Sequence, residues 1–281
     1  MLEQLYPLKL IEKNNLYALL LGIAYSVIGI GLAVLLFPED PALVAVALIS
    51  IMFYPTINKL MKQEESIETE QKEFNFMVFL KDHRYVFMIY MLMFSGMLLT
   101  FSYFSLLLPK MASNHIFQNQ INVMTGNAVA FEGGLFRSLL QNNLIVMIVI
   151  FITAMLLGDG GIFLITWNAS VWGTIFGNLA KTAAFNANQN PFTYFLIVIG
   201  IVSPHMLLEA FSYIVAATTG GVVSNAMIKE KLASKKFNNI ATNTVISLAI
   251  ALIILLIAVA VETYVLGNVE VYKTIIRQSF I

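Results

Sequence analysis

The sequence predicts an all-α protein, a polytopic transmembrane helical bundle with about seven spans, and two observations lead to this fold class. The first is composition: 59% of the 281 residues are hydrophobic, 11% are charged, and the mean hydropathy is +0.81. A soluble domain carries about 25% charged residues. The second is a series of uncharged apolar runs of about 20 residues, the length of a helix that crosses the hydrocarbon layer. We therefore expect a multi-pass protein of the cell membrane.

The charges of the chain are balanced, with 16 Lys and Arg against 16 Asp and Glu. A neutral chain has no overall field that attracts nucleic acid, so the expected partners are membrane lipid and other membrane proteins, and no nucleic acid. The absence of cysteine excludes disulfides, thiolate metal sites and cysteine nucleophiles. No cofactor is expected.

The chain starts with a predicted transmembrane hairpin over residues 1–57. Its first span, 16–37, is uncharged and too long for the apolar core of a signal peptide. An acidic turn, Pro38–Pro41, leads into a short second span over 42–57. The polar segment 58–84 has many glutamates and no Gly or Pro, which predicts a cytoplasmic acidic helical linker. It is interpreted as a solvated connector or as the docking site of a cytoplasmic partner.

A five-helix membrane core is predicted over residues 85–266. One apolar run, from Leu144 to Phe176, is too long for a single span. Its glycines therefore predict a turn that divides it into two helices, at Gly158, Asp159 and Gly161. The other three expected spans are 85–108, 192–224 and 243–266.

Two outer segments complete the predicted organisation, the loop 109–142 and the C-terminal tail 267–281. The loop mixes amide side chains with apolar ones, which is typical of a segment that lies on the membrane surface or caps a cavity between helices. Basic residues predict the orientation, because Lys and Arg accumulate on the cytoplasmic side. With the N-terminus inside, eleven of the 16 basic residues fall in cytoplasmic segments and five in outer ones.

The sixth expected helix, 192–224, carries the clearest candidate site. Pro204 removes a backbone hydrogen bond and predicts a kink that leaves carbonyls in need of partners. His205 and Glu209 follow at i,i+4 spacing, on one face and near the middle of the helix. Ionisable groups in hydrocarbon cost about 2.5 to 3.5 kcal/mol each on insertion scales, so this polar midplane site is a functional hypothesis by default.

Three roles remain open for this pair. His205 and Glu209 can satisfy each other at the kink as a structural contact between helices. They can relay a proton or bind a cation, because burial and direct contact shift their charge states in opposite directions. Metal catalysis is the third role, but H-E-x-x-H, serine-elbow and P-loop motifs are absent from the sequence, so neither catalytic residues nor a metal are predicted.

The fifth expected helix carries a stripe of small residues, Ala169, Gly173 and Gly177, whose four-residue spacing permits another helix to approach closely. The same stripe favours a homodimer. Asn168 precedes the stripe and lies deep enough to hydrogen-bond across helices, with Glu209 as its expected partner.

The residues of the expected fourth to sixth helices resemble the stage II sporulation protein M family of integral membrane proteins. The resemblance covers roughly 85–266 and rests on Asn142-Asn143, Gly158 to Gly161, Leu164 to Asn168 with Gly173, and above all Pro204-His205-x-x-x-Glu209. Met206 and Ala169 stand where the family usually has glycine. The resemblance implies a five-helix core that retains the His205 and Glu209 pair and works within a membrane complex.

These features predict a non-enzymatic scaffold component of a membrane complex. The alternative is a transporter or permease subunit in which His205, Glu209 and Asn168 form a midplane proton or ion site. A sealed apolar core around the pair favours the scaffold, whereas a water-accessible cavity favours transport. An intramembrane hydrolase is less well supported, because a nucleophile or second set of ligands is missing from the pattern.

Overall fold

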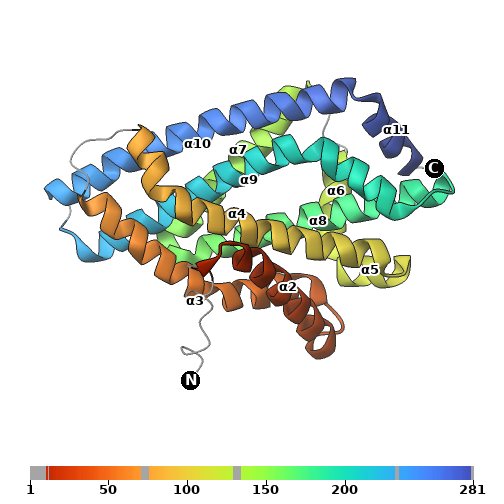
Figure 1. Cartoon of the computed structure of the whole chain (residues 1–281), viewed down its shortest axis with the longest axis horizontal. Coiled ribbons are helices and arrows are strands. Elements are labelled where there is room, and N and C mark those ends of the chain that lie inside the picture. The colour runs from red at the N-terminus through yellow and green to blue at the C-terminus, as the bar shows by residue number, and fades with distance from the viewer. Residues whose placement is uncertain (1–10, 12, 71–75, 129–133, 232–233, 280–281) are drawn as a thin grey trace.

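The computed structural model describes residues 11, 13–70, 76–128, 134–231 and 234–279, and all regular structure within these ranges is helical. The predicted all-α architecture is therefore confirmed. Figure 1 shows the long helices side by side in an elongated bundle, with the short helices α5 and α11 at one end.

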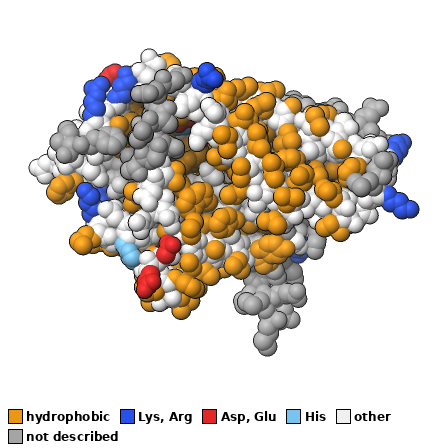
Figure 2. Space-filling view, turned by 180° about the vertical axis from the view of Figure 1, so that it is seen from behind, with side chains coloured by type: hydrophobic (Ala, Val, Ile, Leu, Met, Phe, Trp, Pro, Cys, Tyr) orange, Lys and Arg blue, Asp and Glu red, His pale blue; other side chains and the backbone are white. Residues whose placement is uncertain are grey.

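Seven helices in the described ranges have more than 20 residues. They are α2 (Leu16–Leu36), α3 (Pro41–Glu70), α4 (Phe76–Leu107), α7 (Leu135–Leu157), α8 (Gly161–Asn186), α9 (Pro191–Lys229) and α10 (Lys235–Asn268). All of them except α8 contain a segment long and apolar enough to cross a membrane. Figure 2 shows hydrophobic side chains across the middle of one face and charged side chains at its margins, as a lipid-facing surface requires. Six such helices are the pattern of a multi-pass membrane protein.

The α8 helix lies inside the bundle, packed mainly on α4 and α9. Fourteen of its 26 residues are buried, so its polar residues are sheltered from lipid by other helices. Near its end the Lys181 ammonium donates hydrogen bonds to the carbonyls of Ser105 and Leu108 at the end of α4. A helix C-terminus favours a cation. The lower hydropathy of α8 therefore follows from its interior position.

The small-residue stripe of α8 packs against α4. A Cβ atom added to Gly173 would lie 2.5 Å from the Leu98 carbonyl oxygen, and one added to Gly177 would lie 2.6 Å from that of Ser102. Ala169 is fully buried. The predicted close approach of a helix is thus made by α4 of the same chain. The stripe is covered by α4, so it is not available to a second copy and no longer supports the expected homodimer.

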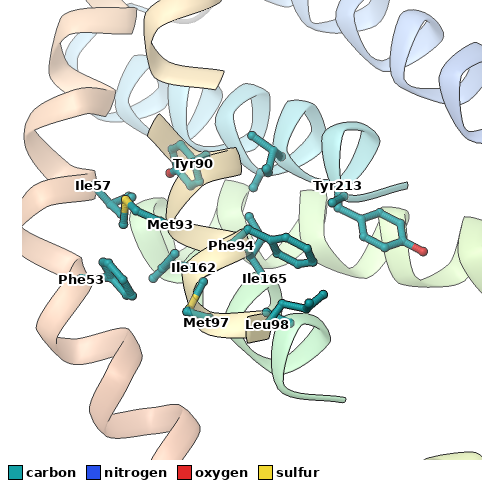
Figure 3. Close-up of a cluster of buried hydrophobic side chains, with 14 of the residues drawn as sticks. Phe53, Ile57, Tyr90, Met93, Phe94, Met97, Leu98, Ile162, Ile165 and Tyr213 are labelled. Atoms are coloured by element: carbon teal, nitrogen blue, oxygen red, sulfur yellow. The ribbon is translucent and has the colours of Figure 1, made fainter. Parts of the chain in front are cut away.

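The main hydrophobic core lies where α3, α4, α8 and α9 meet. Figure 3 shows Phe53 of α3, Phe94 and Met97 of α4 and Ile165 of α8 gathered in this region. The ring centroids of Phe94 and Trp172 are 5.7 Å apart in an edge arrangement, a geometry that aromatic pairs prefer. This core holds α8 and α9 in fixed positions beside the candidate site.

The N-terminal hairpin is packed on the core through glycines. A Cβ atom on Gly22 of α2 would lie 2.5 Å from the Met93 carbonyl oxygen of α4, and one on Gly96 would lie 2.4 Å from that of Leu19. The second span continues as α3 to Glu70, so much of the predicted linker 58–84 is a helical extension of α3 and α4. Its predicted docking surface falls on side chains that lie outside the described residues.

The predicted division of the long apolar run occurs at the glycines. A short 3-10 helix, η3 (Gly158–Gly160), joins α7 to α8. Gly158 has φ of +62°, a conformation that residues with a Cβ rarely adopt. Gly161 begins α8 beside Ala154 and Ala217, which a Cβ atom would approach to 3.1 and 3.2 Å. The side chain of Asp159 lies outside the described residues.

The predicted outer loop 109–142 is largely helical, with α5 (Lys110–Ile116), α6 (Gln118–Ala128) and the first turns of α7. It lies against the turn between α2 and α3, where His115 Nε2 is 2.6 Å from the Pro38 oxygen and Asn119 donates to Asp40 at 3.3 Å. The amides of this segment therefore serve contacts between two connections at the same end of the bundle.

The C-terminal tail forms the helix α11 (Glu270–Ser279). It is tied to the α8–α9 connection because Asn186 donates to the Gln278 carbonyl at 2.8 Å and Tyr194 donates to the Gln278 side chain at 3.0 Å. Burial raises the pKa of the Tyr272 hydroxyl, and the nearby Glu262 carboxyl adds to this effect. The tail is thus a docked amphipathic helix.

Candidate functional site

The candidate site is built on α9, which starts with a well-formed cap. The Asn190 side chain accepts from the backbone N–H groups of Phe192 and Thr193 at 2.8 and 3.4 Å, and Pro191 is the first helical residue. This combination of Asn cap and Pro favours a helix start. The helix continues through Pro204, and the Ser203 hydroxyl donates to the Gly200 carbonyl at 3.4 Å. The Gly200 carbonyl is the one that would accept the hydrogen bond from residue 204, and proline has no N–H to donate.

One face of α9 carries three buried polar side chains at four-residue spacing: His205, Glu209 and Tyr213. Glu209 lies near the middle of the 39-residue helix and only 4% of it is exposed. An acidic side chain is almost never buried this deeply without a partner. The partners of Glu209 therefore define the site.

Glu209 is contacted from two other helices. Asn143 of α7 donates from Nδ2 to Glu209 Oε1 at 2.7 Å, and the Glu262 carboxyl of α10 lies near that of Glu209, with its buried Oε2 atom unpartnered. The Ser212 hydroxyl also donates to the Ala251 carbonyl at 2.9 Å, which joins α9 to α10 close to the site. Glu209, Asn143 and Glu262 thus connect α7, α9 and α10 at one point, which we call the carboxyl pair site.

A direct contact between His205 and Glu209, one of the alternatives left open by the sequence, is absent from the described structure. Within the described structure no hydrogen bond or ion pair joins them, and the buried His205 Nδ1 atom has no hydrogen-bond partner. Spacing of four residues places two side chains on one face, but it does not direct one toward the other. The Asn143 amide and the Glu262 carboxyl occupy the positions around Glu209 instead.

The predicted contact between Asn168 and Glu209 is wrong. Asn168 Nδ2 donates to the Leu164 carbonyl of its own helix at 2.8 Å. The helix that reaches Glu209 is α7, which approaches α9 closely at Gly220, where an added Cβ atom would lie 2.6 Å from the Phe151 carbonyl oxygen. This contact between α7 and α9 brings Asn143, and not Asn168, to the carboxylate.

Sequence reasoning missed Asn143 as a site residue and Glu262 altogether. Asn143 immediately precedes the apolar run and looked like a helix boundary, but α7 begins eight residues earlier at Leu135. Glu262 is an acid inside the predicted span 243–266, and that alone was a usable signal, because ionisable residues within spans are rare.

A cavity of about 350 Å³ lies beside the carboxyl pair site. It is bounded by α7, α8 and α9, and Val123 of α6 lies at its edge. Asn143 and Tyr213 both line it, together with Asn168. Glu209 is therefore separated from this cavity by its own hydrogen-bond donor, Asn143.

The chemistry of the carboxyl pair site follows from its donors. An ionised carboxylate only accepts hydrogen bonds and repels a second one beside it, so two neighbouring carboxyls favour a proton on one of them or a cation between them. In the part of the chain that the structure describes, neither Glu209 nor Glu262 has a Lys or Arg partner, and no three His, Asp or Glu side chains gather as a metal site. The arrangement is suited to taking up and releasing a small cation, of which the proton is the simplest.

Comparison of the chain with models of known families, with curated proteins and with solved structures finds no match. The resemblance to the stage II sporulation protein M family therefore stays a prediction. The functional conclusion rests on the geometry of the carboxyl pair site and of the cavity next to it.

Proposed function

We propose that this protein is a transporter or permease subunit in which Glu209 and Glu262 bind and release a proton or a monovalent cation. The observation that carries the proposal is the carboxyl pair itself: Glu209 is buried in mid-helix and Glu262 half-buried near the end of α10, and neither has a basic partner among the described residues. Asn143, the hydrogen-bond donor of Glu209, lines a cavity. Carboxyl groups within spans commonly mark proton and ion pathways.

The proposal includes seven spans, with α8 as the interior one, and the N-terminus in the cytoplasm. The lysine-rich end of α9 and start of α10 lie at the same end of the bundle as the start of α4 (Figure 1). Clustering of basic residues at one end supports a cytoplasmic assignment for that end.

A second candidate is the non-enzymatic scaffold component of a membrane complex, as members of the stage II sporulation protein M family are expected to be. The observation that favours it is that Glu209 accepts a hydrogen bond from Asn143 of another helix, α7. Such contacts stabilise helix association without any turnover. In this reading, other membrane proteins and a cytoplasmic partner at 58–84 bind the outside of the bundle.

The two candidates separate in reconstituted vesicles that contain a pH-sensitive dye. We expect the parent protein to carry protons, and Glu209→Gln and Glu262→Gln each to abolish the flux while the folded yield is kept, because the glutamine amide still hydrogen-bonds. Glu270→Gln, at an exposed acid on α11, is the matched control and should leave the flux unchanged.

The scaffold candidate makes the opposite prediction. The parent protein would then show no flux of protons, sodium or potassium, and Glu209→Leu, which removes the acceptor of the Asn143 hydrogen bond, would lower the folded yield in detergent whereas Glu209→Gln would not. That pair of results would refute the transport proposal.

A further inference from the structure

The cavity beside the carboxyl pair site is a groove between α7 and α8. The α7 helix packs mainly on α9 and α8 mainly on α4 and α9, and α7 and α8 make few contacts with each other. Ile145 and Val149 of α7 line the groove while 54% and 45% exposed, so its side is open. Both residues lie within the span Leu135–Leu157, and the opening therefore faces hydrocarbon.

The floor of the groove is Tyr213 of α9. Only 2% of this residue is exposed, yet its hydroxyl has no hydrogen bond within the described structure. Figure 3 shows the Tyr213 ring extending away from the labelled core residues, with the hydroxyl at its far end. A buried tyrosine hydroxyl usually finds a partner. An unpartnered hydroxyl that lines a groove points to a ligand.

The remaining lining selects the kind of ligand. Asn142, Asn143 and Asn168 add amide groups, and within the described lining no side chain is ionisable apart from the tyrosine. An anionic head group would find no Lys or Arg in this lining. The only two tryptophans of the chain, Trp167 and Trp172, supply rigid apolar walls, and the Trp172 ring centroid is 6.3 Å from that of Tyr213.

We propose that this groove binds an uncharged amphiphile from the membrane, with a hydroxyl or carbonyl head group hydrogen-bonded to Tyr213 and the amides. Its hydrocarbon tail leaves between Ile145 and Val149 into the lipid. The volume, about 350 Å³, is at the small end of ligand pockets and suits a compact head group and the start of a tail. Glu209 and Glu262 are not among the residues that line the groove, so binding there can be measured separately from proton transport.

The two tryptophans make the groove directly observable. The purified protein is placed in phosphatidylcholine vesicles that contain a long-chain alcohol brominated near its hydroxyl, and tryptophan emission is followed as the alcohol content rises. Phosphatidylcholine brominated at a comparable depth reports ordinary lipid contact. We expect saturable quenching by the alcohol and a linear, weaker effect of the phospholipid.

Two matched pairs of variants locate the binding. Tyr213→Phe removes only the hydroxyl and should lower the affinity for the alcohol about tenfold, as loss of one hydrogen bond predicts. Tyr264→Phe, at an exposed position on α10, should leave the affinity unchanged. Val149→Phe narrows the groove and should abolish the saturable quenching by the alcohol. Ile148→Phe, equally exposed but outside the groove, should keep it.

The inference is overturned if the alcohol and the phospholipid quench alike without saturation, or if Tyr213→Phe binds the alcohol as the parent does. Should Tyr213→Phe fail to fold, the second pair decides: equal saturation in Val149→Phe and Ile148→Phe excludes the groove. Proton flux in the same vesicles is a separate readout, so failure of the transport proposal leaves this result unaffected.

Discussion

The hydrogen bond from Asn143 to Glu209 gives the sharpest stability prediction. Asn143→Leu keeps the number and branching of the side-chain heavy atoms but removes the donor at 2.7 Å from Glu209 Oε1. A hydrogen bond to a charged group contributes about 1.5 to 3 kcal/mol, whereas interhelical bonds measured in a membrane protein average about 0.6 kcal/mol. The short distance is typical of a charge-assisted bond. We therefore expect a coupling of about 1.5 kcal/mol or more.

A double-mutant cycle isolates this coupling. Asn143→Leu, Glu209→Leu and the double variant are unfolded from mild detergent micelles by titration with dodecyl sulfate, and helicity reports the free energy of unfolding. The loss in the double variant should be smaller than the sum of the two single losses, because the second substitution has no bond left to break. Effects that add to within about 0.5 kcal/mol would refute the bond.

Two further predictions test the packing and the topology. Gly173→Ala places a methyl group 2.5 Å from the Leu98 oxygen and should lower the free energy of unfolding by about 1 to 3 kcal/mol. In the control Gly200→Ala, the added methyl group has no neighbouring atom within 4 Å, so this variant should be as stable as the parent or more stable. Equal midpoints of the two variants in thermal unfolding would contradict the interior position of α8. For the topology, single cysteines at Ser66 and Asn119 are treated with an impermeant maleimide in intact cells; Asn119→Cys should be labelled and Ser66→Cys protected, and the reverse pattern would overturn the proposed orientation.

Much of the fold could be predicted because helix segments that contact lipid must be apolar, so hydropathy identifies them. The apolar run 192–224 lies within α9, and the glycine turn divides 144–176 as expected. Hydropathy does not report helices that continue beyond the lipid, so the end of α9 beyond residue 224 was missed. The helical extension of α3 was predicted from the helix-forming residues and charge pattern of the polar segment instead. Hydropathy also fails for α8, which is shielded by α4 and α9 and has no reason to be strongly apolar.

The candidate site was predicted in part. Glu209 could be identified because a buried acid in an apolar helix is unusual. Its partners could not, since spacing along one helix reveals only neighbours on that helix, and Asn143 and Glu262 come from helices distant in sequence. Their positions depend on how α7 and α10 are rotated about their own axes, and this rotation is set by packing at Gly220 and Ala251.

The sheltered position of α8 bears on how the protein is assembled during synthesis. Because α4 precedes α8 in the chain, the surface of α4 that receives Gly173 and the carbonyl that receives Lys181 are synthesised before α8. In a circular permutant that places α8 ahead of α4, the weakly apolar α8 would be synthesised before its packing partner α4. The order of the helices along the chain is thus also a workable order of insertion.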